Sequence, residues 1–157
     1  MQKITPFLWF DDNAEEAVNF YTRIFPDAEI TEIFRWPENM PGKAGTVLTI
    51  GFRLFGQDYT AMNGGPQFKF NESVSFVVHC DSQEEVDKYW DLLMDGGTAQ
   101  ACGWLKDRFG LSWQIVPDKI IRLMQDPDKE KATRAMQAMM QMVKLDLHGV
   151  EKAYQGA

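Results

Sequence analysis

Apolar and polar positions alternate along this chain in two patterns, and each pattern occurs twice. In residues 13–24 and 82–93, apolar side chains recur at positions i, i+3, i+4 and i+7, with charged residues between them. This spacing predicts two amphipathic helices that each place one aromatic-rich face on a core. The helices align at an offset of 69 residues (82 minus 13), so that Phe20 corresponds to Tyr89 and Ile24 to Leu93.

Both predicted helices begin with the same signal. Asn13 and Ser82 are each followed three residues later by a glutamate, Glu16 and Glu85. In such a capping box the first side chain accepts a hydrogen bond from the amide of the third helical residue, and the glutamate reaches back to the cap amide. We therefore expect a capping box at each helix start.

Short apolar runs surround the helices and predict β-strands. Residues 4–10 and 74–80 precede the helices and are rich in aromatic and β-branched side chains, as strands are. The later runs predict six more strands, at 30–36, 46–52, 57–63, 98–102, 104–107 and 111–116. Within them Gly56 matches Gly110 and Thr60 matches Gln114 at an offset of 54 (110 minus 56).

The order of these elements is β-α-β-β-β, written twice. We predict an α+β fold in one domain, with module one at 3–66, module two at 72–117 and a helical tail at 118–157. One such unit cannot cover both faces of its sheet, so two are expected to close around a shared core and a concave cleft. The pattern leaves open whether the modules pair within one chain or between two.

The tail differs in composition from the modules. Residues 119–124 predict a short helix, and Asp126-Pro127 predicts an N-cap followed by proline at the first helical position. Five of the nine methionines lie here: Met124, Met136, Met139, Met140 and Met142. They favour a flexible packing face against the sheet or a second subunit, and an adaptable binding surface is the alternative.

The overall charge excludes some partners. The net charge of −7 and the pI of about 4.8 argue against nucleic acid, whose phosphates need a basic face. No segment approaches the about 20 apolar residues of a membrane span. The first residues lack the features of a signal peptide, and two cysteines do not make a disulfide framework, so we expect a cytoplasmic protein.

Two motifs resemble a known family. The helix motif Glu15-Glu16-Ala17-x-x-Phe20-Tyr21 and the run Cys102-Gly103-Trp104-Leu105-Lys106-Asp107-Arg108-Phe109-Gly110-Leu111-Ser112-Trp113-Gln114-Ile115-Val116-Pro117 are similar to the PhnB-like branch of the vicinal-oxygen-chelate, or glyoxalase and dioxygenase, superfamily. That branch often carries the label 3-demethylubiquinone 3-methyltransferase. The resemblance extends over residues 4–154, tail included, and implies a glyoxalase-like curved mixed sheet.

The resemblance also implies where a metal would lie. The superfamily holds a divalent ion with His, Glu or Gln side chains from strands of both modules, as a Lewis acid for substrates with adjacent oxygens. Those positions fall on Thr5, Thr60, Ser75 and Gln114. Only Gln114 is a plausible ligand for a transition metal. We therefore expect no metal and no other cofactor, with a divalent metal as the less favoured alternative.

Other reactive side chains are few. His79 either lines the cleft as a general base or is a hydrogen-bonded structural histidine, and it points away from its neighbour Cys80 because strand side chains alternate. Cys102 is either a nucleophile or a small buried residue at a strand end. Lys106 and Asp107 are expected to form a solvated pair in a turn.

Aromatic residues mark the expected ligand site. Four rings sit on strands that line or border the cleft, and four polar side chains accompany them: Phe7, Trp9, Trp104 and Trp113, with Thr60, Ser75, His79 and Gln114. Such a wall suits a planar or hydrophobic small molecule. The alternative is that the rings fill the core.

These patterns predict a homodimeric protein that binds a small apolar or aromatic metabolite in a metal-poor cleft. One alternative is an enzyme that acts through Gln114 and His79, as a metal-dependent lyase, isomerase or dioxygenase, or as the methyltransferase of the family label. The glycine pairs argue against the last, because neither Gly64-Gly65 nor Gly96-Gly97 opens a helix after a strand. A ligand-sequestering protein or a purely structural dimer is the other alternative.

Overall fold

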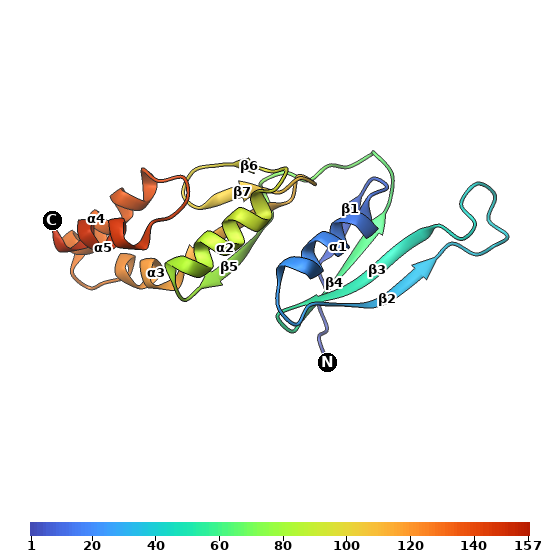
Figure 1. The fold of residues 1–157 in the computed structure, drawn as a ribbon, viewed down its shortest axis with the longest axis horizontal. Helices are drawn as coiled ribbons and strands as arrows, with labels where there is room; N and C mark the ends of the chain where they lie inside the picture. Colours follow the sequence, from blue (N-terminus) through green and yellow to red (C-terminus); the bar gives the residue numbers. More distant parts are fainter. The chain divides into compact units, whose positions relative to one another are not determined.

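A computed structural model describes residues 1–157 of the chain. The chain divides into two compact units, Met1–Phe70 and Asn71–Ala157, each built on one four-stranded sheet (Figure 1). The division falls between the two predicted modules. None of the helices is long and apolar enough to cross a membrane.

The first unit has a mixed sheet with a helix on one face. Its elements are β1 (Phe7–Phe10), α1 (Ala14–Ile24), β2 (Glu29–Arg35), β3 (Val47–Leu54) and β4 (Gln57–Asn63), and the strands lie in the order β1-β4-β3-β2. Strand β1 runs parallel to β4, and the other pairs are antiparallel. Helix α1 packs on β3 and β4, and Phe10, Ile50 and Phe52 are buried.

The second unit repeats this topology. Its elements are β5 (Ser75–Cys80), α2 (Gln83–Met94), β6 (Thr98–Ala99), β7 (Trp104–Lys106) and β8 (Ser112–Pro117), in the strand order β5-β8-β7-β6. Strand β5 is parallel to β8, and α2 buries Val86 and Leu93. Two βαβββ modules and an α+β fold are thereby confirmed, with predicted strand 4–10 shortened to its last four residues.

The turn that leads into the helix differs between the units. Buried Leu8 and Phe10 correspond to buried Val78 and Cys80 at an offset of 70 (80 minus 10), whereas the helices align at 69. The first unit therefore has one extra residue between its first strand and its helix. Side chains in this turn cannot reach the helix start in the same way in both units.

The helix caps reflect that extra residue. The Asn13 side chain makes no cap hydrogen bond, so the predicted capping box there is wrong. Instead, the amide of Ala14 donates to Oδ1 of Asn63 from the end of β4 at 2.9 Å. Ser82 does cap α2, accepting from the Glu85 amide at 3.2 Å. Glu85 accepts from the amide of Asp81, one residue before the cap.

The tail consists of α3 (Asp118–Met124), α4 (Lys129–Met140) and α5 (Leu147–Gln155). It packs beside the end of β8, where Val116 joins the buried cluster Ile120, Ala135, Leu145 and Val150. Asp126 was predicted as the N-cap of this helix, but the N-cap of α4 is Asp128. Asp126 instead accepts hydrogen bonds from the Asp128 amide and the Tyr154 hydroxyl. Met142 and Val143 lie beyond α4, where their carbonyls accept from Cys102 and Gly103.

Candidate functional site

The sheet face opposite α1 carries the candidate residues of the first unit. Strand alternation and register place Phe7 and Trp9 of β1 on this open face, beside Thr60 and Met62 of β4. Phe7 is 58% exposed and Trp9 is half-buried. The expected sharing of one face by these two rings agrees with the structure.

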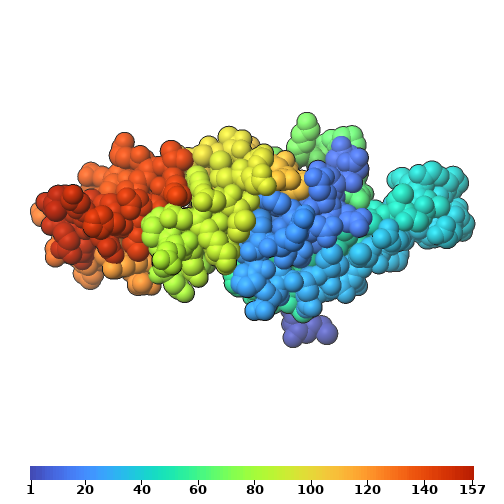
Figure 2. Space-filling view, in the orientation of Figure 1, coloured from blue at the N-terminus to red at the C-terminus, as the bar shows by residue number.

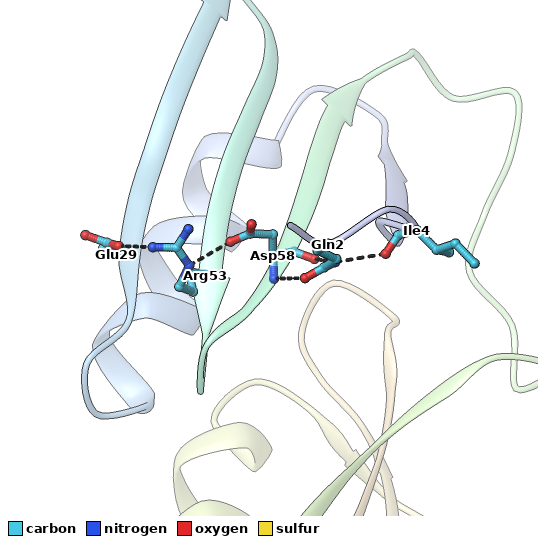
Figure 3. Close-up of polar contacts among 5 residues, drawn as sticks. All are labelled: Gln2, Ile4, Glu29, Arg53 and Asp58. Carbon is cyan, nitrogen blue, oxygen red and sulfur yellow. Dashed lines mark hydrogen bonds and ion pairs between the residues drawn. The ribbon is translucent and has the colours of Figure 1, made fainter.

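One end of this face is occupied by a polar network (Figure 3). Arg53 pairs with Glu29 at 2.6 Å and with Asp58 at 2.7 Å, bridging β2, β3 and β4. The Gln2 side chain accepts from the Asp58 amide at 2.9 Å and donates to the Asp58 carbonyl at 2.8 Å. These contacts tie the segment before β1 to the sheet.

A hollow of about 630 Å³ lies at the other end of the first unit's sheet. It is lined by Trp9, Asp11, Asp12, Trp36, Lys43, Thr46, Val47, Leu48, Met62, Asn63, Gly64 and Gly65. Trp9 is held in place, since its Nε1 donates to the Gly65 carbonyl at 2.9 Å and its ring meets Phe68 edge-on at 5.0 Å. A Cβ at Gly64 would lie 2.4 Å from the Trp9 ring, so position 64 needs glycine.

Trp36 supplies the second ring of the hollow. It follows β2, at the base of the loop that projects beyond its sheet (Figures 1 and 2). Its amide donates to the Thr46 carbonyl at 2.8 Å, and its carbonyl accepts from the Gly45 amide at 3.1 Å. The ammonium of Lys43, from the same loop, lies 4.9 Å from the centroid of the Trp36 ring.

The open face of the second unit carries a polar pair. Gln114 donates to the Ser75 hydroxyl at 2.9 Å, and register places the half-buried Trp104 beside Gln114. Ser112 shares this face, and its buried hydroxyl has no hydrogen-bond partner. With His79, which alternation along β5 places on the same side as Ser75, the face carries four of the predicted residues: Ser75, His79, Trp104 and Gln114.

His79 and Cys80 lie on opposite faces of β5, as predicted. His79 is exposed, and its Nδ1 lies 2.6 Å from Oδ1 of Asp118, the first residue of α3. Cys80 is 1% exposed. Burial, and then the charge of Glu85, raises the pKa of the Cys80 thiol to about 12, so it is not a nucleophile at neutral pH.

Trp113 has a different environment from the other rings. It lies on the face that α2 covers, is 3% exposed, and donates from Nε1 to Oδ2 of Asp107 at 2.9 Å. Asp107 also accepts from the amides of Phe109 at 2.8 Å and Leu111 at 3.1 Å. At 4% exposure Asp107 is buried, so the expected solvated pair with Lys106 is wrong, and Lys106 pairs with Glu72 instead.

The positions that the resemblance assigns to a metal do not offer a transition-metal donor set. Thr5 lies before β1, and Thr60 and Ser75 present hydroxyls, which are poor ligands for such ions. The Gln114 side chain donates to Ser75 from Nε2, so the four positions offer one amide oxygen beside the hydroxyls. No group of three His, Cys, Asp or Glu side chains is placed to hold an ion.

Of the residues that line the hollow, only Trp9 was predicted as a site residue, and the charged and aromatic ones that escaped the sequence prediction are Asp11, Asp12, Trp36 and Lys43. Trp36 was predicted as the last residue of strand 30–36, but β2 ends at Arg35 and Trp36 begins a Pro- and Gly-containing loop. Lys43 lies further along that loop, which carries no strand pattern that would assign it to a face. The only local signal was the extra residue in the turn before α1, which contains Asp11 and Asp12.

The family model for 3-demethylubiquinone-9 3-methyltransferase matches residues 2–116. A Bacillus cereus protein described as a 3-demethylubiquinone-9 3-methyltransferase, PhnB protein, is 39% identical, with a TM-score of 0.68 over 74% of this chain and 99% of that one. No curated protein matches this sequence.

Two further solved structures share the fold alone. PA1353 from Pseudomonas aeruginosa is 22% identical, with a TM-score of 0.60 over 73% of this chain and 96% of that one. The fosfomycin resistance protein FosX of Listeria monocytogenes, solved with Mn(II) and sulfate, is 16% identical, with a TM-score of 0.51 over 74% and 91% of the two chains. The family match ends at residue 116, so it does not include the tail, to which the resemblance was expected to extend.

Proposed function

We propose that this chain, a member of the 3-demethylubiquinone-9 3-methyltransferase family with a glyoxalase-like fold, binds a small apolar or aromatic molecule. The observation that carries the proposal is the hollow beside Trp9 and Trp36. Its volume of about 630 Å³ lies within the range of small-molecule sites. Val47, Leu48 and Met62 add apolar lining.

The state of Trp9 supports stacking as the mode of binding. Its only polar atom is bonded to Gly65, so the ring offers a face and no free donor. A ring fixed by a hydrogen bond and by the neighbouring Phe68 loses little conformational entropy when a planar ligand packs on it.

The test is a screen of aromatic compounds by thermal shift, followed by calorimetry of the hits against Trp9→Ala and Trp36→Ala. Loss of one stacking ring is expected to weaken binding about tenfold, given about 0.5–1.5 kcal/mol per ring pair beyond area burial. Phe34→Ala is the matched control, because Phe34 is an exposed ring of the same unit that does not line the hollow. Unchanged affinity in both tryptophan variants would reject the site.

An enzymatic role is the second candidate, and the contact between His79 and Asp118 at 2.6 Å favours it. A carboxylate that accepts from Nδ1–H leaves Nε2 free to take a proton, which is the arrangement of a general base. Gln114 and Ser75 on the same face would orient a substrate oxygen. Turnover of a bound ligand should then fall strongly in His79→Ala and partly in Asp118→Asn, with little change in ligand affinity.

The methyltransferase activity of the family label has weaker support from the residues. Gly64 and Gly65 follow β4 and pack at Trp9, while Gly96, with φ of +77°, follows α2. Neither pair forms the strand-to-helix turn that common S-adenosylmethionine enzymes use. Absence of product methylation with S-adenosylmethionine, under conditions where ligand binding is measured, is the expected result.

We also propose that ligand binding needs no metal. Three of the four positions that correspond to the superfamily's metal ligands carry hydroxyl side chains: Thr5, Thr60 and Ser75. Elemental analysis of protein purified without chelator is expected to give well below one transition metal per chain. Stoichiometric zinc, iron, nickel or manganese that disappears in Gln114→Ala would contradict this.

We also propose a cytoplasmic homodimer. Exposed apolar side chains on α4, including Met136 and Met140 at 46% and 57% exposure, favour a covered tail surface. Light scattering should give twice the chain mass at micromolar concentration, and Met140→Lys should lower it while Lys129→Met does not. A monomeric mass for both the parent chain and Met140→Lys would contradict the dimer.

A further inference from the structure

The polar side chains of the hollow in the first unit divide into satisfied and unsatisfied groups. Asn63 accepts from Ala14 at 2.9 Å and donates to the Val47 carbonyl at 3.2 Å. The Thr46 hydroxyl donates to the Lys43 carbonyl at 2.6 Å. Both side chains are uncharged and already hydrogen-bonded within the protein, so neither offers a charge to a ligand.

Three charged side chains remain available. Asp11 and Asp12 are exposed at the hollow, and neither forms an ion pair with a cation of the protein. Lys43 is exposed too, and its ammonium rests on Trp36 without a carboxylate partner. The hollow is therefore lined by two carboxylates and two indole rings. Its one cationic side chain is that of Lys43.

The contact between Lys43 and Trp36 identifies what the ring can bind. At 4.9 Å from the centroid, the ammonium lies within the about 6 Å over which a ring face attracts a cation. Tryptophan is the strongest of the aromatic side chains in this interaction, and carboxylates beside the ring add a second attraction for the same charge. The chain supplies this cation itself, from the loop between β2 and β3.

We propose that the hollow takes an aromatic molecule that carries an ammonium group, an inference that rests on the proposed function and names its ligand class. The ring of the ligand packs on Trp9, and its cation occupies the region of Trp36, Asp11 and Asp12. Lys43 then acts as a tethered competitor that a ligand must displace. The net charge of −7 also favours the approach of a cation over that of an anion.

The test compares three probes of similar size by calorimetry at low salt: phenyltrimethylammonium, benzyl alcohol and benzoate. Phenyltrimethylammonium is expected to bind about tenfold more tightly than benzyl alcohol, the gain typical of a partly desolvated cation on an indole face. Benzoate is expected to bind most weakly. Indole NH resonances of Trp9 and Trp36, assigned with Trp→Phe variants, should shift on titration.

Lys43 gives the sharpest variant, because the competitor model predicts a gain of affinity. Lys43→Gln should tighten phenyltrimethylammonium binding about threefold, whereas Asp11→Asn with Asp12→Asn should weaken it about tenfold. Lys69→Gln is the control for net charge, since Lys69 is an exposed lysine of the same unit outside the hollow. It should change the affinity by much less than Lys43→Gln.

The outcomes separate the ligand class from the site. Equal binding of phenyltrimethylammonium and benzyl alcohol, or tighter binding of benzoate that Lys43→Gln weakens, overturns the ammonium class while the aromatic site stands. Binding of no probe, together with no hit in the aromatic screen that depends on Trp9, overturns both the class and the proposed function. Tighter binding of phenyltrimethylammonium by Lys43→Gln, without a similar gain in Lys69→Gln, supports the inference.

Discussion

The two modules share one topology and place different chemistry on it. Trp9 of the first open face corresponds to His79 of the second at the strand offset of 70 (79 minus 9), and Thr60 corresponds to Gln114 at 54 (114 minus 60). The first face is aromatic around a hollow, whereas the second holds the Ser75–Gln114 hydrogen bond and the His79–Asp118 contact. A repeated fold thus conserves which positions face outward but not what those positions do.

The last hairpins of the two modules differ in the same way. The turn between β3 and β4 has two residues, Phe55 and Gly56, whose φ angles of 47° and 78° suit a tight hairpin turn made by backbone alone. The turn between β7 and β8 is longer and is organised by the buried carboxylate of Asp107. The second hairpin therefore depends on one side chain, and the first does not.

The largest expected effect separates the two tryptophans. Trp113→Ala should lower the free energy of unfolding by about 3–5 kcal/mol, because it empties a packed core and leaves Asp107 without a donor. Trp9→Ala should cost less than about 2 kcal/mol, since Trp9 is only half-buried. Urea denaturation followed by circular dichroism measures both. Equal losses would mean that Trp9 is a core residue too.

The next effect tests the hairpins. Asp107→Ala should cost about 3 kcal/mol, because a half-buried amide, a buried amide and a buried indole NH lose their acceptor. Arg53→Ala, in the corresponding hairpin of the first unit, should cost much less, since its ion pairs are solvent-exposed. Asp107→Asn is the conservative control and should retain part of the stability. A larger loss of stability in Arg53→Ala than in Asp107→Ala would mean that the first hairpin depends more on its side chain than the second.

Helix caps give a smaller effect. Asn63→Ala and Ser82→Ala should each cost about 1 kcal/mol, because each removes the acceptor at a helix start. Asn13→Ala should change stability by less than about 0.5 kcal/mol, as expected for a side chain that makes no cap bond. Thermal unfolding of the three variants measures these differences. An equal loss of stability in Asn13→Ala and Asn63→Ala would mean that Asn13 also caps α1.

The smallest effect concerns the tail, which only the second unit has. Hydrogen bonds from Lys144 and then Gln83 lower the pKa of Asp87, and the Tyr154 hydroxyl lowers that of Asp126. Because the folded pKa values lie below the ordinary carboxyl value of 3.8, this stabilisation is complete above that value and is lost as pH falls through the folded values.

The same bond raises the pKa of Tyr154, so its contribution is complete below the ordinary value of 10.0 and is lost as pH rises through the folded value. Hydrogen exchange, corrected for the intrinsic rate at each pH, should therefore show weaker protection of α5 at both extremes. Asp126→Asn should remove most of the acid effect. An equal change in the first unit would assign the effect to global unfolding.

Much of the fold was predictable because alternation and helical spacing record which residues share a face. They placed Phe7 with Trp9, separated His79 from Cys80, and located α1 and α2 within one residue at each end. Such patterns do not record which open position becomes a site. Trp36 was predicted to end strand 30–36, but it lies with Lys43 in the loop after β2, and their contact depends on how that loop folds back.

The sequence by itself determined the repeated βαβββ order, the faces of the strands and the family, since all three depend on residue types at fixed spacing. Only the tertiary structure decided that Asn63 caps α1 from 49 residues further along the chain and that Asp107 is buried beneath Trp113. It also decided that Trp9 borders a hollow while Trp113 does not. A polar group or a ring takes its role from the partners that folding brings to it, and those partners are distant in sequence.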